Sequence, residues 1–136
     1  MRYLAIDYGT KRTGLAVCDA AETIASPYDV LPGQKDLVQR IRRVVASENI
    51  EAIVLGLPLN MDDSEGPQAK KVRAFAKQLG TQIHIPVYLQ DERLSSFGAE
   101  QKLGEIGLSK GKCRARLDAL AAAEILQAFL ARKGGG

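Results

Sequence analysis

Apolar residues in this chain form short continuous runs and longer stretches with helical spacing, and the two kinds alternate. Short runs are typical of buried strands, whereas apolar residues that recur every three or four positions are typical of amphipathic helices. The runs predict a strand that begins at Tyr3, a returning strand at 15–18, and further strands at 23–31, 52–57 and 83–90.

Four further stretches have helical spacing or helical boundary signals. They lie at 35–48, from Pro67 to about Leu79, from Ser95 or Ser96 to Ile106, and at 115–132. Pro67 suits a first helical turn, and Gly80 is expected to end the second helix. Residues 107–111 are expected to form a loop. A single domain is expected at 1–133, followed by a disordered tail at 134–136.

The order of these elements predicts the class of fold. Consecutive strands joined by short turns are typical of an antiparallel meander, and alternating strands and helices are typical of parallel units. Pro27 indicates that the third strand is irregular or lies at an edge, because proline cannot donate a ladder hydrogen bond. The pattern therefore predicts an α/β protein with a mixed sheet and helices on both faces.

The composition is that of an ordinary globular protein, with 136 residues, 46% hydrophobic, 26% charged and a formal net charge of +3. No apolar run approaches the roughly 20 residues that cross a bilayer, so no membrane partner is expected. The N-terminus lacks the pattern of a signal peptide, and the two cysteines form no metal or redox motif. We therefore expect a cytoplasmic protein with free thiols, whose charge permits a nucleic-acid partner without requiring one.

Candidate chemistry lies at the ends of the predicted strands. Asp7 ends the first run, and a turn follows in which Gly9 and Gly14 are the conformationally permissive residues. The pair Asp91–Glu92 ends the last run. If the first and last strands are parallel near neighbours, these acids lie at adjacent strand ends.

A third acid, Asp118, lies on the final predicted helix. The residues that share its helical face are all apolar: Ala122, Ile125 and Phe129. This face is expected to press on the sheet, which would turn Asp118 toward the edge of the core. Basic residues precede it at Lys110, Lys112, Arg114 and Arg116, and they suit a phosphate backbone near the acids.

Three carboxylates in a small space repel one another, and divalent cations remove this repulsion. Ligand sets made of oxygen alone favour Mg²⁺ or Mn²⁺, and two such ions about 4 Å apart can activate water for attack on a phosphodiester. Each acid alone also fits a structural role. Asp7 suits a turn, Asp91–Glu92–Arg93 a surface ion pair, and Asp118 a helix N-terminus.

Four stretches of the chain resemble the YqgF family, also called RuvX-like, of Holliday-junction resolvases and pre-16S ribosomal RNA nucleases. The stretches are 6–16 (Ile-Asp-Tyr-Gly-Thr-Lys-Arg-Thr-Gly-Leu-Ala), 54–62 (Val-Leu-Gly-Leu-Pro-Leu-Asn-Met-Asp), 91–96 (Asp-Glu-Arg-Leu-Ser-Ser) and 118–122 (Asp-Ala-Leu-Ala-Ala). They occur in the family's order, and the resemblance covers essentially the whole chain. Asp63 and the Arg114–Leu117 step depart from the family pattern, but neither departure touches the acids.

The resemblance implies a ribonuclease H-like fold with a mixed five-stranded sheet, and it implies site residues. The acidic set would be Asp7, Glu92 and Asp118, with Asp91 as the rival of Glu92, because neighbouring residues on a strand point to opposite faces. Substrate contacts would come from the basic residues that precede Asp118 and from Lys11, Arg12, Asn60, Asp62 and Arg93.

The implied activity is a nuclease dependent on Mg²⁺ or Mn²⁺ that processes the 5′ end of pre-16S ribosomal RNA, with ribosomal particles as candidate partners. Cleavage of branched DNA is the alternative, and RNA and DNA remain open at this point. A protein that binds nucleic acid or assists ribosome assembly without catalysis is a second class. The Asp-Tyr-Gly-Thr-Lys stretch also resembles the first phosphate loop of actin-like ATPases, but those enzymes bind ATP between two such domains. A monomer or a weak homodimer is expected.

Overall fold

The computed structural model describes residues 1–60, 62, 64–91 and 110–135, without the side chains of 110–116. The elements are β1 (Tyr3–Asp7), β2 (Arg12–Cys18), β3 (Ala25–Pro32), α1 (Leu37–Ser47), β4 (Ala52–Leu57), α2 (Pro67–Gln82), β5 (Val87–Asp91) and α4 (Lys110–Gly135). Within these described residues, no helix is both long enough and apolar enough to cross a membrane.

The strands form a mixed sheet of five strands in the order β3-β2-β1-β4-β5. The β1–β2 and β2–β3 pairs are antiparallel, and the β1–β4 and β4–β5 pairs are parallel. The register between β2 and β3 shifts between Leu15 and Ala16, opposite Pro27, so the irregular edge strand predicted from this proline is confirmed. The carboxyl ends of β1, β4 and β5 lie at one edge of the sheet.

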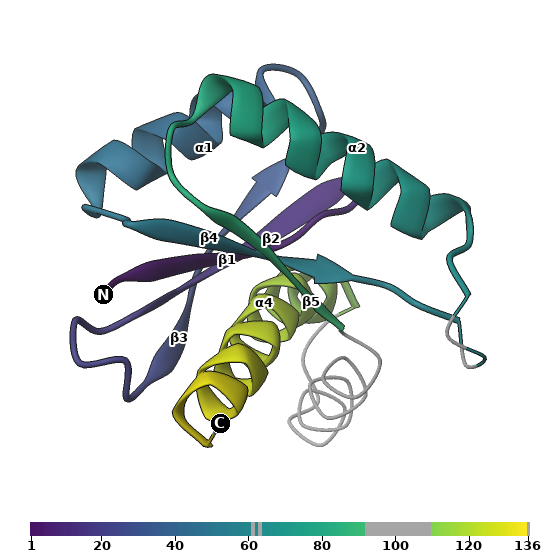
Figure 1. Ribbon diagram of the computed structural model, residues 1–136. Coiled ribbons are helices and arrows are strands. Elements are labelled where there is room, and N and C mark those ends of the chain that lie inside the picture. The colour runs from purple at the N-terminus through teal and green to yellow at the C-terminus, as the bar shows by residue number, and fades with distance from the viewer. Residues whose placement is uncertain (61, 63, 92–109, 136) are drawn as a thin grey trace.

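Helices cover both faces of the sheet, as Figure 1 shows, with α1 and α2 on one face and α4 on the other. Alternate residues of β1 separate the two cores: Leu4 and Ile6 pack toward α1 and α2, whereas Tyr3 and Ala5 pack toward α4. On α4, the packed residues include Ala122, Ile125 and Phe129, the apolar face predicted from the sequence. The predicted α/β architecture with helices on both faces is confirmed.

The end of α2 differs from the prediction. The helix continues through Gly80 to Gln82, and the Ile83 N–H donates to the Leu79 carbonyl at 2.7 Å. Gly80 is exposed, and a glycine there costs the helix only about 1 kcal/mol, which burial of Leu79 and Ile83 outweighs. The following strand therefore starts at Val87 and not at Ile83.

The final helix is longer than predicted at both ends. It begins at Lys110, so residues 110 and 111 of the expected loop are helical. Lysine favours a helix, and the helix also includes Gly111 despite the low helix propensity of glycine. It also includes Gly134 and Gly135, which were expected in the tail, because glycine can adopt helical angles where preceding carbonyls accept its N–H. The helix predicted from Ser95 or Ser96 to Ile106 lies outside the described residues.

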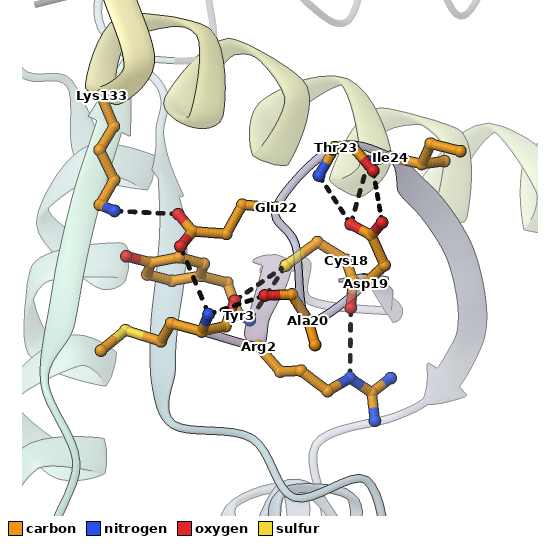
Figure 2. A network of polar contacts seen from close by, with 10 residues as sticks. Arg2, Tyr3, Cys18, Asp19, Ala20, Glu22, Thr23, Ile24 and Lys133 are labelled. Carbon is orange, nitrogen blue, oxygen red and sulfur yellow. Dashed lines mark hydrogen bonds and ion pairs between the residues drawn. The ribbon is translucent and has the colours of Figure 1, made fainter.

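Polar contacts anchor the carboxyl end of α4 to the β2–β3 connection and to the N-terminus (Figure 2). Glu22 accepts hydrogen bonds from Lys133 Nζ at 2.9 Å and from the terminal amine of Met1 at 3.3 Å. Lys133 Nζ also lies 5.8 Å from the centre of the Tyr3 ring, and the Tyr3 N–H donates to Cys18 Sγ at 3.2 Å. Cys18 is a buried free thiol, and burial raises its pKa. These contacts fix the carboxyl end of α4.

Candidate active site

Asp7 is the last residue of β1 and lies at the edge where the parallel strands end. The alternation along β1 places it on the α4 face, in series with Tyr3 and Ala5. Its side chain is half-buried, and its partner across the antiparallel pair is Gly14 of β2. The acid therefore sits on the sheet face that α4 covers, opposite a residue without a side chain.

Gly14 is the position where α4 reaches the sheet. A Cβ added to it would lie 1.9 Å from the Asp118 carbonyl oxygen and 2.3 Å from the Asp118 carbonyl carbon. Such separations are far inside van der Waals contact, so only glycine permits this packing. Because Gly14 also pairs with Asp7, the packing brings the backbone of Asp118 next to the strand end that carries Asp7. The backbone segments that carry two of the three predicted acids are thus adjacent.

The sequence interpretation of Gly14 as a turn residue was wrong. β2 begins at Arg12, so Gly14 lies inside the strand, where it is buried and has no positive φ. A glycine within an apolar strand pattern does signal a close backbone approach. That signal was available, but it does not say which segment makes the approach.

Asp118 forms an ion pair with Arg12, whose Nε donates to Asp118 Oδ2 at 2.7 Å. The two side chains are 26% and 35% exposed, so the pair is partly shielded from water. Arg12 was predicted to contact substrate phosphates, and in this structure its guanidinium binds and orients Asp118. The second oxygen, Asp118 Oδ1, accepts no hydrogen bond from a residue that the structure describes.

Asp91 lies on the other face of the sheet. Along β5, the Tyr88 ring is 5.5 Å from the Phe129 ring of α4, and Leu89 packs against the α1–α2 core. The alternation then places Gln90 on the α4 face and Asp91 on the α1–α2 face, opposite to Asp7. Asp91 is therefore not on the face that carries the other two acids. Its rival Glu92 lies outside the described residues.

The first and last strands, considered above as possible near neighbours, run parallel to each other with β4 between them. Two inter-strand spacings separate their backbones, or about 10 Å. An acid on β5 must therefore reach across β4 to share a site with Asp7. In the described part of the chain, no three potential ligands gather closely enough to hold a metal ion.

Asn60 and Asp62 follow β4 at the same sheet edge, where they stabilise their own loop. Asn60 Nδ2 donates to Ser64 Oγ at 2.9 Å, and the Ser64 N–H and hydroxyl both donate to Asp62 Oδ1, at 3.0 and 2.5 Å. The hydroxyl bond is the main reason that the pKa of Asp62 is lowered. These bonds are internal to the loop, and the predicted contact of both residues with substrate stays a prediction.

The loop between β1 and β2 is braced by Gln34, a residue that the sequence analysis missed. Gln34 Nε2 donates to the Gly9 carbonyl at 2.8 Å, and its Oε1 accepts a hydrogen bond from the Tyr8 hydroxyl at 2.9 Å. Gln68 Nε2 donates to the Tyr8 carbonyl at 3.3 Å, and the Tyr8 ring stacks on Phe75 at 4.2 Å. No sequence signal marks either glutamine, because both lie far along the chain from the loop they hold.

The structure describes some of the remaining candidate substrate-binding residues and not others. Lys11 is exposed in the β1–β2 loop, directly before Arg12. Arg93 lies outside the described residues. The basic residues before Asp118 lie in the first turns of α4, and the structure describes their backbone but not their side chains. They are Lys110, Lys112, Arg114 and Arg116.

Sequence comparisons identify relatives over almost the full length. A family model named RuvX and described as Holliday junction resolvase matches residues 1–132. A protein of Maridesulfovibrio salexigens is 40% identical over 134 residues, covering 97% of this chain and 99% of the relative. A protein of Anaeromyxobacter sp. is 45% identical over 133 residues, covering 96% of each chain. Both relatives carry the name pre-16S rRNA nuclease.

Solved structures share the fold at low sequence identity. RuvC of Thermus thermophilus in complex with a Holliday junction substrate has a TM-score of 0.61 at 18% identity, covering 99% of this chain and 97% of that chain. The Fowlpox virus resolvase in complex with Holliday junction DNA has a TM-score of 0.59 at 15% identity, covering 98% and 99%. At such identity the likeness concerns the fold alone, and it confirms the ribonuclease H-like architecture expected from the sequence.

Proposed function

The chain belongs to the RuvX family, and from this premise we propose that it is a divalent-metal-dependent nuclease that processes the 5′ end of pre-16S ribosomal RNA. The observation that carries the proposal is the packing of α4 on Gly14, which brings Asp118 to the strand end that holds Asp7. The proposed site is Asp7, Asp118 and Glu92. This function implies a cytoplasmic location and ribosomal particles as partners.

The donor set fits a hard divalent cation. Asp7 and Asp118 are half-buried carboxylates on one face of the sheet, and Asp118 Oδ2 is already held by Arg12 while Oδ1 faces no described donor. Carboxylate oxygens are the ligands that Mg²⁺ and Mn²⁺ prefer. Glu92 has a side chain one methylene longer than that of aspartate, which suits a ligand that must reach across β4.

In this proposal, the residues of the chain hold and orient the reacting groups. A bound Mg²⁺ or Mn²⁺ would supply Lewis-acid stabilisation of charge on the phosphate and a water nucleophile at neutral pH. Arg12 fixes the orientation of Asp118, and the braces from Gln34 and Gln68 hold the loop that follows Asp7. Lys11 on that loop contributes a cation for a substrate phosphate.

The acid assignment is tested with Asp7→Asn, Glu92→Gln and Asp91→Asn. Each is assayed on end-labelled RNA that carries the precursor 5′ extension, in Mn²⁺ and in EDTA. We expect Asp7→Asn and Glu92→Gln to abolish cleavage while circular dichroism shows an unchanged fold. Asp91→Asn is the matched control, because this acid faces the α1–α2 layer, and it should retain activity. Retained cleavage in Asp7→Asn would sink the assignment.

A Holliday junction resolvase is the second candidate function, because the matching family model carries that description. Symmetric cutting of a four-way DNA junction, with no cut in the RNA, would favour it. A resolvase needs two matched sites, so light scattering of the protein with the junction should then show a dimer. Cleavage of neither substrate by folded protein would instead favour a binding or assembly role.

A further inference from the structure

The outer surfaces of α1 and α2 carry basic residues and no acidic ones. α1 contains three arginines and α2 contains three lysines and one arginine, with no Asp or Glu in either helix. The two helices thus hold a formal charge of +7, whereas the whole chain holds +3. These two helices are therefore more basic than α4, whose six basic and two acidic residues give a formal charge of +4. They form the layer that covers the sheet face opposite α4 (Figure 1).

Two of these cations are occupied by structural contacts. Arg40 Nη1 donates to the Pro32 carbonyl at 2.8 Å, and its Nη2 donates to the Lys35 carbonyl at 2.8 Å. Arg73 pairs with Glu65 at 2.5 Å. Both therefore tie the helices to their neighbouring loops, and neither is counted as available for a partner.

The other five form what we call the α1–α2 basic face: Arg42, Arg43, Lys70, Lys71 and Lys77. All five side chains are exposed, and among the described residues none has a hydrogen-bond or ion-pair partner within 4 Å. The pKa of Glu65 is lowered mainly by its hydrogen bond from Arg73, and the charge of Lys70 helps to lower it. Arg42 and Arg43 border an open groove of about 320 Å³ that Gln39 and Ala46 also line. Unpaired like charges on adjacent helices repel, so this face gains free energy when a polyanion covers it.

We propose that the α1–α2 basic face binds the phosphate backbone of a double-stranded RNA stem at a distance from the cleavage site. Lys70 to Lys77 span about 10 Å along α2, and α1 lies about 8–10 Å beside it. Double-stranded DNA presents one charge per about 1.7 Å of axis when both strands are counted, or about six phosphates over that length, and an RNA duplex likewise carries two charges per base pair. A duplex backbone therefore matches both the extent and the sign of the face.

The residue types on the α1–α2 basic face favour a double-stranded ligand over a single-stranded one. The exposed aromatic residues among those described are Tyr28 and Tyr88, on β3 and β5, so α1 and α2 offer no ring on which single-stranded bases could stack. Lysine and arginine without aromatic neighbours bind phosphates irrespective of sequence. The face is also unsuited to a self-contact between two copies, since each copy would present the same charge.

The position of the face determines its role. Asp7 lies on the α4 face of the sheet, whereas these cations lie on the helices that cover the other face. Lys70 and Lys71 follow Gln68, which contacts the loop after Asp7, so the basic face begins near that edge of the sheet and extends away from it along α2. The phosphates that the face binds are therefore not those being cut. This inference rests on the proposed RNA-processing function and adds to it that the substrate extends past the cut into a stem held by the helices on the other face of the sheet.

The test compares two double variants of equal charge. Lys71→Gln/Lys77→Gln removes two cations from the face, and Gln127→Glu/Arg132→Gln lowers the net charge by the same amount at exposed positions of α4. Fluorescence anisotropy in EDTA measures binding to a hairpin RNA with a single-stranded 5′ extension, and to the extension alone, across a range of salt concentrations. We expect the face variant to lose affinity for the hairpin by about tenfold to a hundredfold at about 0.1 M salt, and the salt slope to fall by about two.

The extension alone should bind the face variant and the wild type equally, and the α4 variant should bind the hairpin like the wild type. Equal losses in both variants, or unchanged hairpin binding by the face variant, would overturn the inference. A changed oligomeric state with unchanged hairpin affinity would overturn it in favour of a protein contact. Cleavage in Mn²⁺ is measured separately. If the wild type cleaves the RNA and the face variant binds the hairpin as tightly as the wild type does, only this inference is refuted. If the wild type does not cleave and the face variant loses hairpin affinity as predicted, only the proposed function is refuted.

Discussion

Replacing Gly14 with alanine should displace α4 and separate the two acids. The added Cβ would lie 1.9 Å from the Asp118 carbonyl oxygen, whereas unstrained contacts start near 3.4 Å. The backbone of α4 or β2 must therefore move by more than an ångström, because the atoms it meets are backbone atoms that cannot rotate away. Overpacking of this kind costs about 1–3 kcal/mol, and a displacement of about 1 Å at a catalytic group can cost about a hundredfold in rate.

Gly80→Ala is the matched control, because it makes the same chemical change at a glycine with opposite surroundings. Gly80 is exposed inside α2, and its Cβ position has no atom within 4 Å. Alanine there should raise the free energy of unfolding by about 0.5–1 kcal/mol and leave cleavage unchanged. Urea unfolding gives the stability of both variants, and initial rates of RNA cleavage give their activity.

The outcome is informative because a domain of this size has about 5–15 kcal/mol of stability and should remain folded after the substitution. We expect Gly14→Ala to lose far more activity than stability, since the displaced segment carries Asp118. A Gly14→Ala protein with wild-type stability and wild-type cleavage would refute the argument that close packing at this glycine assembles the site. A loss of stability without a loss of activity would refute the argument that the packing at Gly14 positions the two acids.

Three further predictions follow from individual contacts. Gln34→Ala removes the two bonds that brace the β1–β2 loop, so kcat should fall while the free energy of unfolding drops by only about 0.5–1.5 kcal/mol in urea melts. Arg12→Gln removes a cation from Asp118, so the Mn²⁺ concentration for half-maximal cleavage should fall, whereas Arg12→Lys should leave it near the wild-type value. Bonding to Lys133 lowers the pKa of Glu22 from its usual 4.5, so Glu22 contributes stability above that value and loses it as pH falls through the folded pKa. The melting temperature of Glu22→Gln should therefore lie below that of the wild type near pH 7, and the difference should vanish in acid.

The sequence predicts an element correctly where its local pattern of apolar residues also reflects how the element is buried in the fold. The run at 52–57 is apolar at every position, and β4 has these bounds and is buried on both faces. Prediction failed where two local signals competed. Gly80 suggested a helix stop, but the burial of Leu79 and Ile83 keeps the helix intact past it. Tertiary packing decided that boundary, and it is not visible in a window of a few residues.

Contacts between residues far apart in the sequence were harder to predict. Arg12 and Asp118 are 106 positions apart, and nothing in either local sequence indicates that the cation would pair with this acid. The same holds for Gln34 and the Gly9 carbonyl, 25 positions apart. A sequence pattern identifies which residue types could perform the chemistry, whereas their partners depend on how the sheet orders its strands.

The choice between Asp91 and Glu92 shows how one structural fact converts an open alternative into a definite expectation. Local sequence cannot say which of two adjacent acids faces inward, because the alternation along a strand shows only that the two side chains point to opposite faces of the sheet. The ring contact between Tyr88 and Phe129 assigns the α4 face to the even positions of β5, and the packing of Leu89 assigns the other face to the odd ones. Asp91 then shares a face with α1 and α2, on the side that carries the basic residues and not on the side of Asp7. The same alternation that separates the two cores therefore separates a catalytic candidate from its neighbour.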